Sequence, residues 1–105
     1  VDIYLKDKPV ITLNAYLDTG NMLKDPYKNR PIILVKKDKI PSDSETIIYV
    51  PYSTIDNNGV IKCFKPEKIY IYSHGYRQKL LIGLIDEVGI EGADCILNKN
   101  LIERI

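Results

Sequence analysis

Short runs of alternating apolar and polar residues, separated by turn sequences, restrict the fold of this chain most strongly. In the run 11–17 every second residue is apolar, which is the pattern of a strand with one buried face. Further β-prone runs cover residues 3–5, 31–35, 47–50, 60–64, 69–72 and 79–85. Only the tail, residues 97–105, has the apolar spacing of a short helix. We predict an all-β domain in which six or seven short strands form a closed or nearly closed antiparallel barrel, followed by one short C-terminal helix.

The length and composition fit a single domain that covers residues 1–105. Lys and Arg total 15, Asp and Glu total 14, and the net charge is +1, so binding of nucleic acid or of a membrane surface has little support. Cys63 and Cys95 are far apart, with no further Cys or His at metal-ligand spacing. We expect two buried free thiols and no metal or other cofactor.

Asp18, Thr19 and Gly20 follow directly after the run 11–17. We expect residues 3–5 and 11–17 to form a β-hairpin whose second strand ends at Asp18. Asp-Thr-Gly is the signature of aspartic proteases, which need two carboxylates about 3 Å apart that share one proton. The triplet occurs once, so this chemistry requires two chains per active site. The alternative is that Asp18 is a turn residue that accepts backbone hydrogen bonds.

A long hairpin with a polar tip is predicted between Val50 and Phe64, because Asn58-Gly59 is a strong turn signal between β-prone runs. With this hairpin after a strand and Asp-Thr-Gly, the chain resembles a protomer of the retropepsin-like aspartic proteases. The resemblance implies a barrel of that type in which the hairpin is a flap that closes over an extended peptide. The flap tip would consist of Thr54, Ile55, Asp56, Asn57, Asn58 and Gly59. The alternative is a hairpin turn without a binding role.

A longer set of motifs resembles one family in particular. Residues 18–26 spell Asp-Thr-Gly-Asn-x-Leu-x-Asp-Pro, followed by Arg-Pro-Ile-Ile-Leu-Val at 30–35 and Val-Pro-Tyr-Ser at 50–53. This spacing is similar to that of the sporulation sigma-E factor-processing peptidases. The resemblance implies the C-terminal protease domain of a multi-pass membrane protein, placed on the cytoplasmic face of the cell membrane. It also implies that the substrate is a sigma-factor precursor, from which the enzyme removes the pro-sequence.

The resemblance assigns a role to each residue of the motif. Asp18 and its counterpart in a second chain would hold a water, which one carboxylate deprotonates while the other donates a proton to the scissile carbonyl oxygen. Thr19 would hydrogen-bond across the two-fold axis. Gly20 would leave room for the two carboxylates and donate its backbone N–H to Asp18. Asn21 stands where many relatives have Ser or Ala, and we expect its amide to donate to the outer oxygen of Asp18.

Two departures from the retropepsin pattern concern the end of the chain and its assembly. Asn98 stands where those enzymes usually have Gly before the helix, and we expect it to adopt the left-handed backbone angles that Asn tolerates. The chain begins at Val1 without Met and lacks the terminal strands of retropepsin dimers. We therefore interpret it as part of a longer protein and expect a weak homodimer or a monomer in isolation. The alternative function is a non-catalytic barrel that binds a peptide or oligomerises.

Overall fold

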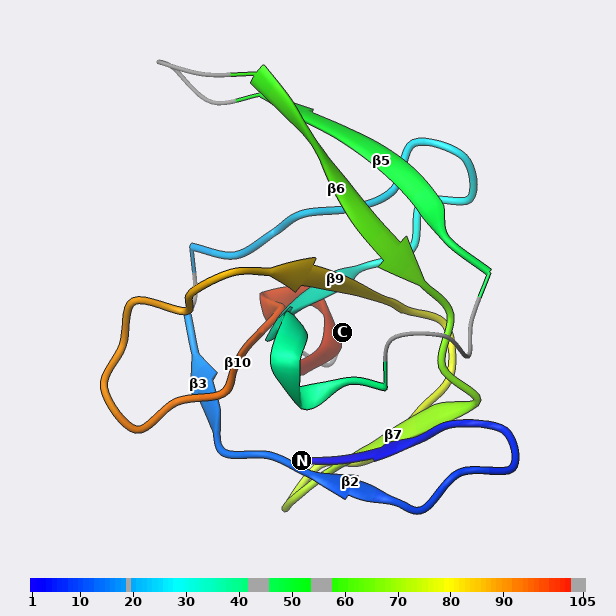
Figure 1. Ribbon diagram of the computed structural model, residues 1–105, viewed down its shortest axis with the longest axis vertical. Helices are drawn as coiled ribbons and strands as arrows, with labels where there is room; N and C mark the ends of the chain where they lie inside the picture. The colour runs from blue at the N-terminus through cyan, green and yellow to red at the C-terminus, as the bar shows by residue number, and fades with distance from the viewer. Residues whose placement is uncertain (19, 42–45, 54–57, 103–105) are drawn as a thin grey trace.

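The computed structural model describes residues 1–18, 20–41, 46–53 and 58–102. The described elements are β1 (Asp2–Tyr4), β2 (Ile11–Thr12), β3 (Ala15–Leu17), β4 (Ile32–Lys36), the 3-10 helix η1 (Lys37–Lys39), β5 (Ile48–Ser53), β6 (Asn58–Phe64), β7 (Lys68–Ile71), β8 (Gly75–Arg77), β9 (Leu81–Ile85), β10 (Cys95–Leu97) and α1 (Lys99–Ile102) (Figure 1). The prediction of a mainly β chain with one short helix near its end is confirmed. Neither described helix has the length and apolar character needed to cross a membrane.

The strands form two sheets, so the prediction of a closed antiparallel barrel is wrong for the described residues. The smaller sheet has the order β2-β1-β7-β8, and the larger has the order β3-β10-β4-β9-β6-β5. The larger sheet is mixed, because β10 runs parallel to β3 and β4 runs parallel to β9. Alternation along a strand specifies its buried face but not its neighbour or their relative direction. The pattern therefore identified strands without identifying their pairing.

The predicted strand 11–17 is divided between the two sheets. β2 pairs with β1, with Ile11 opposite Ile3, whereas β3 pairs with β10. Between them Leu13 is buried in the core, and its backbone N–H donates to the carbonyl of Val1 at 2.9 Å. The expected hairpin is thus confirmed for β1 and β2 only. Asp18 follows a strand that lies at the edge of the larger sheet.

The central strand β4 is buried on both faces, as its continuous apolar sequence indicates. Ile33 and Val35 belong to the larger hydrophobic cluster, which extends to the smaller sheet through Ile3 and Ile69. Ile32 belongs to a smaller cluster that it shares with residues of β5, β6 and β9, namely Val50, Ile61, Cys63 and Leu81. β4 therefore joins the sheet-to-sheet core to the base of the β5–β6 hairpin.

The long hairpin is formed by β5 and β6 and projects from the body of the molecule at the top of Figure 1. Ser53 pairs with Asn58, and Tyr52 pairs with Gly59. Asn58 and Gly59 thus lie within β6, and the prediction that they form the turn is wrong; the predicted tip residues 54–57 lie outside the described residues. Gly59 faces Tyr52 across the strand pair, and a Cβ at position 59 would lie 2.6 Å from the Tyr52 ring. Gly59 provides the space that this ring needs across the strand pair.

Both cysteines are free and buried, as the sequence predicted. Cys63 belongs to the smaller hydrophobic cluster and Cys95 to the larger one. Burial raises the pKa of each thiol to about 12. The two residues therefore behave as small apolar side chains rather than as nucleophiles.

Candidate active site

Asp18 lies just beyond β3 and its side chain is half-buried. Its Oδ1 accepts a hydrogen bond of 2.8 Å from the backbone N–H of Gly20, as expected from the sequence. Its own carbonyl accepts a hydrogen bond of 3.0 Å from the N–H of Asn21. A Cβ at Gly20 would lie 3.1 Å from Oδ1, so the absence of a side chain at position 20 permits this close contact. Thr19 lies outside the described residues.

The side chain of Asn21 is bonded within the protein, so the expectation that it donates to Asp18 is wrong. Its Nδ2 donates to the carbonyls of Leu97 at 3.2 Å and Ile32 at 3.3 Å, and its Oδ1 accepts from the N–H of Leu23 at 3.3 Å. Asn21 is buried, and a buried amide must satisfy its donors with nearby acceptors or lose stability. Asn21 therefore fastens the Asp18 loop, described at residues 18, 20 and 21, to β4 and β10.

Asn98 has a second, fully buried side-chain amide, which bonds to the start of β4 as the Asn21 amide does. Its Nδ2 donates to the carbonyls of Leu23 at 2.8 Å and Ile32 at 3.1 Å, and its Oδ1 accepts from the N–H of Asn100 at 2.9 Å. The last contact caps the N-terminus of α1. Positive φ angles are found at Asp7, Asn29 and Ser73 but not at Asn98. The left-handed conformation expected for Asn98 is therefore wrong, and its hydrogen bonds explain the choice of residue.

The amides of Asn21 and Asn98 share one acceptor, the carbonyl of Ile32. In addition, the N–H of Lys99 in the first turn of α1 donates to the carbonyl of Asn21 at 3.0 Å. These bonds join the Asp18 loop, the start of β4 and the β10–α1 junction. We call the side chains of Asn21 and Asn98 with their backbone partners the asparagine network. Sequence reasoning missed it, although an Asn directly before a helical tail is a known capping signal.

Asp25 is a second carboxylate, and it is 1% exposed. Its Oδ1 accepts from the N–H groups of Tyr27 and Lys28, each at 2.8 Å, and its Oδ2 accepts from Nε of Arg30 at 2.7 Å and from the N–H of Arg30 at 3.0 Å. Burial opposes ionisation, but the Arg30 guanidinium and the backbone N–H groups outweigh it and lower the pKa of Asp25 to about 2. Asp25 is thus the organising residue of its loop, residues 25–30, which we call the Asp25 loop.

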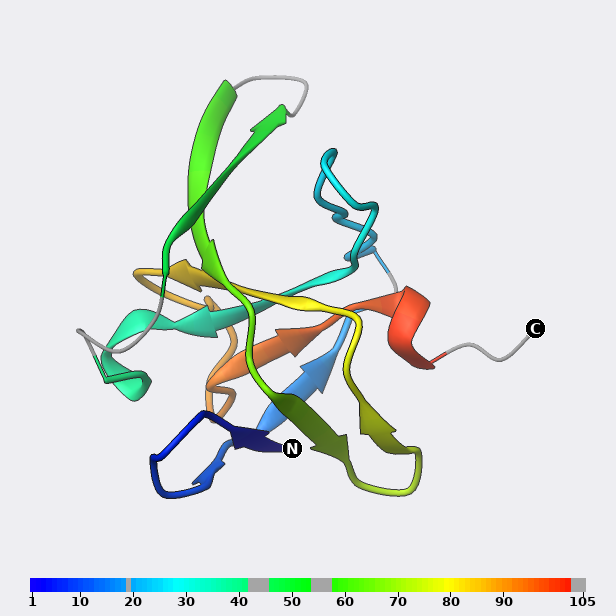
Figure 2. The ribbon, with the colours of Figure 1, turned by 90° about the vertical axis from the view of Figure 1, so that its right-hand side faces the viewer.

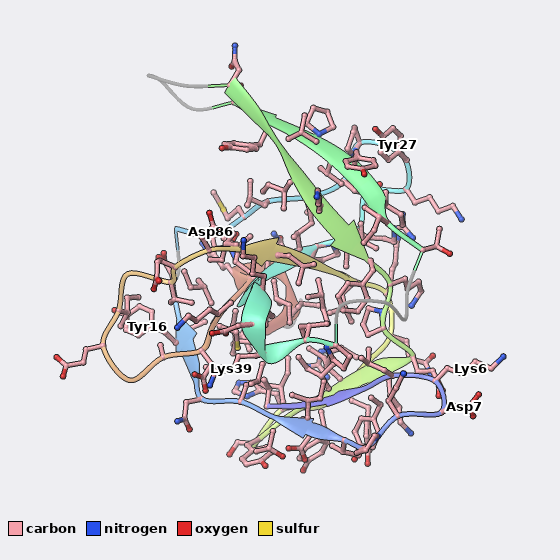
Figure 3. The ribbon with its side chains drawn as sticks, in the orientation of Figure 1. Lys6, Asp7, Tyr16, Tyr27, Lys39 and Asp86 are labelled. Carbon is pink, nitrogen blue, oxygen red and sulfur yellow. The ribbon has the colours of Figure 1, made fainter. Side chains whose placement is uncertain are left out.

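The Asp25 loop is connected to the hairpin. The hydroxyl of Tyr27 donates to the carbonyl of Tyr49 in β5 at 3.0 Å, and Figure 3 shows Tyr27 beside that strand. One hydrogen bond therefore links the segment that follows Asp18 to the hairpin expected to act as a flap. Among the described residues, no group of three or more His, Cys, Asp or Glu side chains is placed to hold a metal ion.

The surface around Asp18 is apolar and uncovered. All three residues of β3, which lies at the edge of the larger sheet, are exposed, in contrast to the predicted alternation. Tyr16, labelled beside β3 in Figure 3, is 46% exposed, Leu17 is 47% exposed and Met22 is 58% exposed. Tyr16 and Leu17 are consecutive in β3 and therefore point to opposite sides of the sheet, so this edge exposes apolar surface on both faces.

Comparison with known proteins gives two matches. Residues 1–43 match the family described as sporulation factor SpoIIGA. Over 92 residues, or 82% of this chain, the sequence is 37% identical to a Clostridium acetobutylicum protein named "Probable sporulation sigma-E factor-processing peptidase". The match spans about a third (34%) of that protein's length. No solved structure matches the chain.

Proposed function

Because the chain is similar to the sporulation sigma-E factor-processing peptidases, as its motifs indicated, we propose that it is the protease domain of such an enzyme and cleaves a sigma-factor precursor. The similarity supports a sporulation peptidase. The aspartic mechanism rests on one observation: a half-buried Asp18, held by Gly20, on a loop that the asparagine network fixes to the sheet. We also propose that the whole protein is a multi-pass membrane protein with this domain on its cytoplasmic face.

The active form would be a homodimer in which the two Asp18 loops face each other. Aspartic proteolysis needs two carboxylates that share one proton, and each chain supplies one Asp-Thr-Gly. The exposed side chains of Tyr16, Leu17 and Met22 next to Asp18 support a contact at this place, since burying them against a second copy would be favourable. Thr19 would fix the facing loops.

The proposed reaction uses a water held between the two Asp18 carboxylates. The ionised carboxylate removes a proton from the water, which attacks the scissile carbonyl carbon while the protonated carboxylate donates its proton to the carbonyl oxygen. The tetrahedral species then collapses: the Asp18 that took the proton from the water gives it to the leaving amine nitrogen, the C–N bond breaks, and the other Asp18 takes back a hydroxyl proton. The β5–β6 hairpin would cover the bound peptide and exclude water.

The test is processing of the sigma-factor precursor by the full-length protein with Asp18→Asn. We expect a loss of at least about 100-fold, because removal of a general acid or base typically costs 100-fold to 10,000-fold. Circular dichroism should show an intact fold, since Asp18 is half-buried and accepts one side-chain hydrogen bond among the described residues. Asp86→Asn, the same chemical change at an exposed carboxylate, is the matched control and should retain activity.

Two outcomes would contradict the proposal. Retained cleavage by Asp18→Asn would rule out the mechanism. A covalently linked dimer that binds the precursor without cleaving it would support the alternative of a non-catalytic binding module.

A further inference from the structure

A basic hollow lies between three loops of the molecule. It has a volume of about 490 Å³ and is lined by Lys28, Arg30, Lys65, Glu67, Gln78 and Lys79. These residues come from the Asp25 loop, from the link between β6 and β7, and from the link between β8 and β9. The three segments can be followed in cyan, green and yellow in Figure 2. Four lining residues are positive and one is negative, although the whole chain has a net charge of only +1.

The lysines of the hollow are not neutralised by carboxylates. Ion pairs in the described part of the chain involve Arg30, Lys36, Lys37 and Lys39, so Lys28, Lys65 and Lys79 have no ion pair there. Lys65 instead donates from Nζ to the carbonyls of Gln78 at 2.6 Å and Pro66 at 3.3 Å. Burial and the nearby charge of Arg30 lower the pKa of Lys65. This is the direction expected for a cation that lacks an anionic partner.

Two of the four cations are held in place before any ligand arrives. Arg30 is buried, and its Nε is fixed on Asp25 at 2.7 Å. Lys65 is fixed by its two carbonyl acceptors. Lys28 and Lys79 are exposed and can adjust to a ligand. Arg30 is already paired with Asp25, so Lys65 is the ordered cation that can meet an anionic ligand, and its order lowers the entropic cost of binding.

We propose that the basic hollow binds an acidic segment of extended polypeptide. Its volume lies in the range of about 300–1,000 Å³ that is usual for ligand sites and exceeds what a single small anion needs. Its positive charges come from separate segments, which suits carboxylates spaced along a chain. Glu67 in the lining can accept backbone N–H groups of a peptide between its acidic side chains.

The position of the hollow suggests that the acidic segment belongs to the substrate. Lys65 directly follows β6, and the Asp25 loop is bonded to β5 through Tyr27, so both sides of the hollow adjoin the base of the hairpin. A peptide held under the hairpin could continue into the hollow. This identification rests on the proposed protease function, whereas the binding of an acidic peptide does not.

The binding test uses a short fluorescent peptide that alternates Glu and Ser, with a peptide of Gln and Ser as its control. Fluorescence anisotropy should show at least about tenfold tighter binding of the Glu peptide at about 50 mM salt, and weakening at about 500 mM. Lys65→Gln combined with Lys79→Gln should weaken it at least about tenfold. The matched control combines Lys6→Gln and Lys8→Gln, which lie in the exposed β1–β2 turn and should change nothing. Thermal melts should show that both double variants fold.

Several results would overturn the proposal: equal binding of the two peptides, no effect of the hollow variant, or binding of phosphatidylglycerol vesicles in place of the peptide. Displacement of the peptide by inorganic phosphate below about 1 mM would do the same, because it would indicate a site for a single compact anion. Each binding measurement can also be made with proteins that carry Asp18→Asn. Since we expect this substitution to abolish cleavage, the measured peptide binding does not depend on catalysis.

A second measurement tests the link to the substrate in the full-length protein. The variant with both Lys65→Gln and Lys79→Gln should raise KM for the precursor about tenfold and leave kcat unchanged. This is expected because the lost contacts would stabilise the bound substrate and the transition state equally. Unchanged KM together with lost peptide binding would overturn the assignment to the substrate but not the site. Retained processing by Asp18→Asn would instead overturn the proposed function.

Discussion

Asp18 and Asp25 lie seven positions apart and illustrate two opposite uses of a carboxylate. In the described part of the chain Asp18 is half-buried and its carboxylate accepts one hydrogen bond, from Gly20. Asp25 is fully enclosed and accepts four hydrogen bonds, two of them from Arg30. A carboxylate whose acceptor sites are all occupied is fixed and ionised, and it stabilises the fold. The carboxylate with sites still open is the one that can bind water and exchange a proton.

The strongest test of this difference is the replacement of each residue by Ala. We expect Asp25→Ala to lower the free energy of unfolding by about 3–5 kcal/mol, because it leaves Arg30 buried without its anion. We expect Asp18→Ala to lower it by less than about 1 kcal/mol, because Asp18 accepts one backbone hydrogen bond at a half-buried site. Urea denaturation measures both values. Equal losses in the two variants would refute the distinction.

A smaller effect is expected from Asn98→Ala, which tests how the Asp18 loop is held. The variant removes the cap of α1 and leaves the carbonyls of Leu23 and Ile32 with fewer donors. We expect a loss of about 2–3 kcal/mol in unfolding free energy. Processing of the precursor should also fall, because the asparagine network positions Asp18. Asn14→Ala at an exposed position is the control, and the interpretation fails if both variants are equally destabilised.

The smallest effect concerns pH. The pKa of Asp25 is lowered from 3.8 to about 2, so its ionised form stabilises the folded state above the pKa of the unfolded chain. This stabilisation, about 2 kcal/mol, should be lost as the pH falls from about 5 to 2. The difference in unfolding free energy between wild type and Asp25→Asn should therefore shrink over this range. Parallel pH profiles for the two proteins would show that Asp25 does not contribute in this way.

The sequence predicted individual strands better than their assembly. The apolar run at β4 was recognised because strands leave a local signal. The pairing of β3 with β10 joins residues 15–17 to residues 95–97, which no local pattern specifies. Likewise, alternation continues through Leu13, and only the contact of Leu13 with Val1 shows where the run divides between the sheets.

The same limit applies to the candidate site. Asp18 and its contact with Gly20 follow from a short motif and were expected from it. Asn21 was misinterpreted, because the carbonyls of Ile32 and Leu97 come within reach of its amide only when the chain is folded. Asn58 and Gly59 have the sequence of a turn, but they pair with Ser53 and Tyr52 in the hairpin, where the glycine leaves room for the Tyr52 ring.

The acceptor shared by Asn21 and Asn98 has a consequence for how such a domain can evolve. Every amino acid has the same backbone carbonyl, so the group that both amides use at position 32 survives any side-chain replacement there. Position 32 is therefore free to drift among apolar residues of similar volume, limited only by packing in the core. Positions 21 and 98 do not have this freedom, because each supplies the amide itself. Among related sequences, selection should constrain these two asparagines more strongly than the residue whose carbonyl joins them.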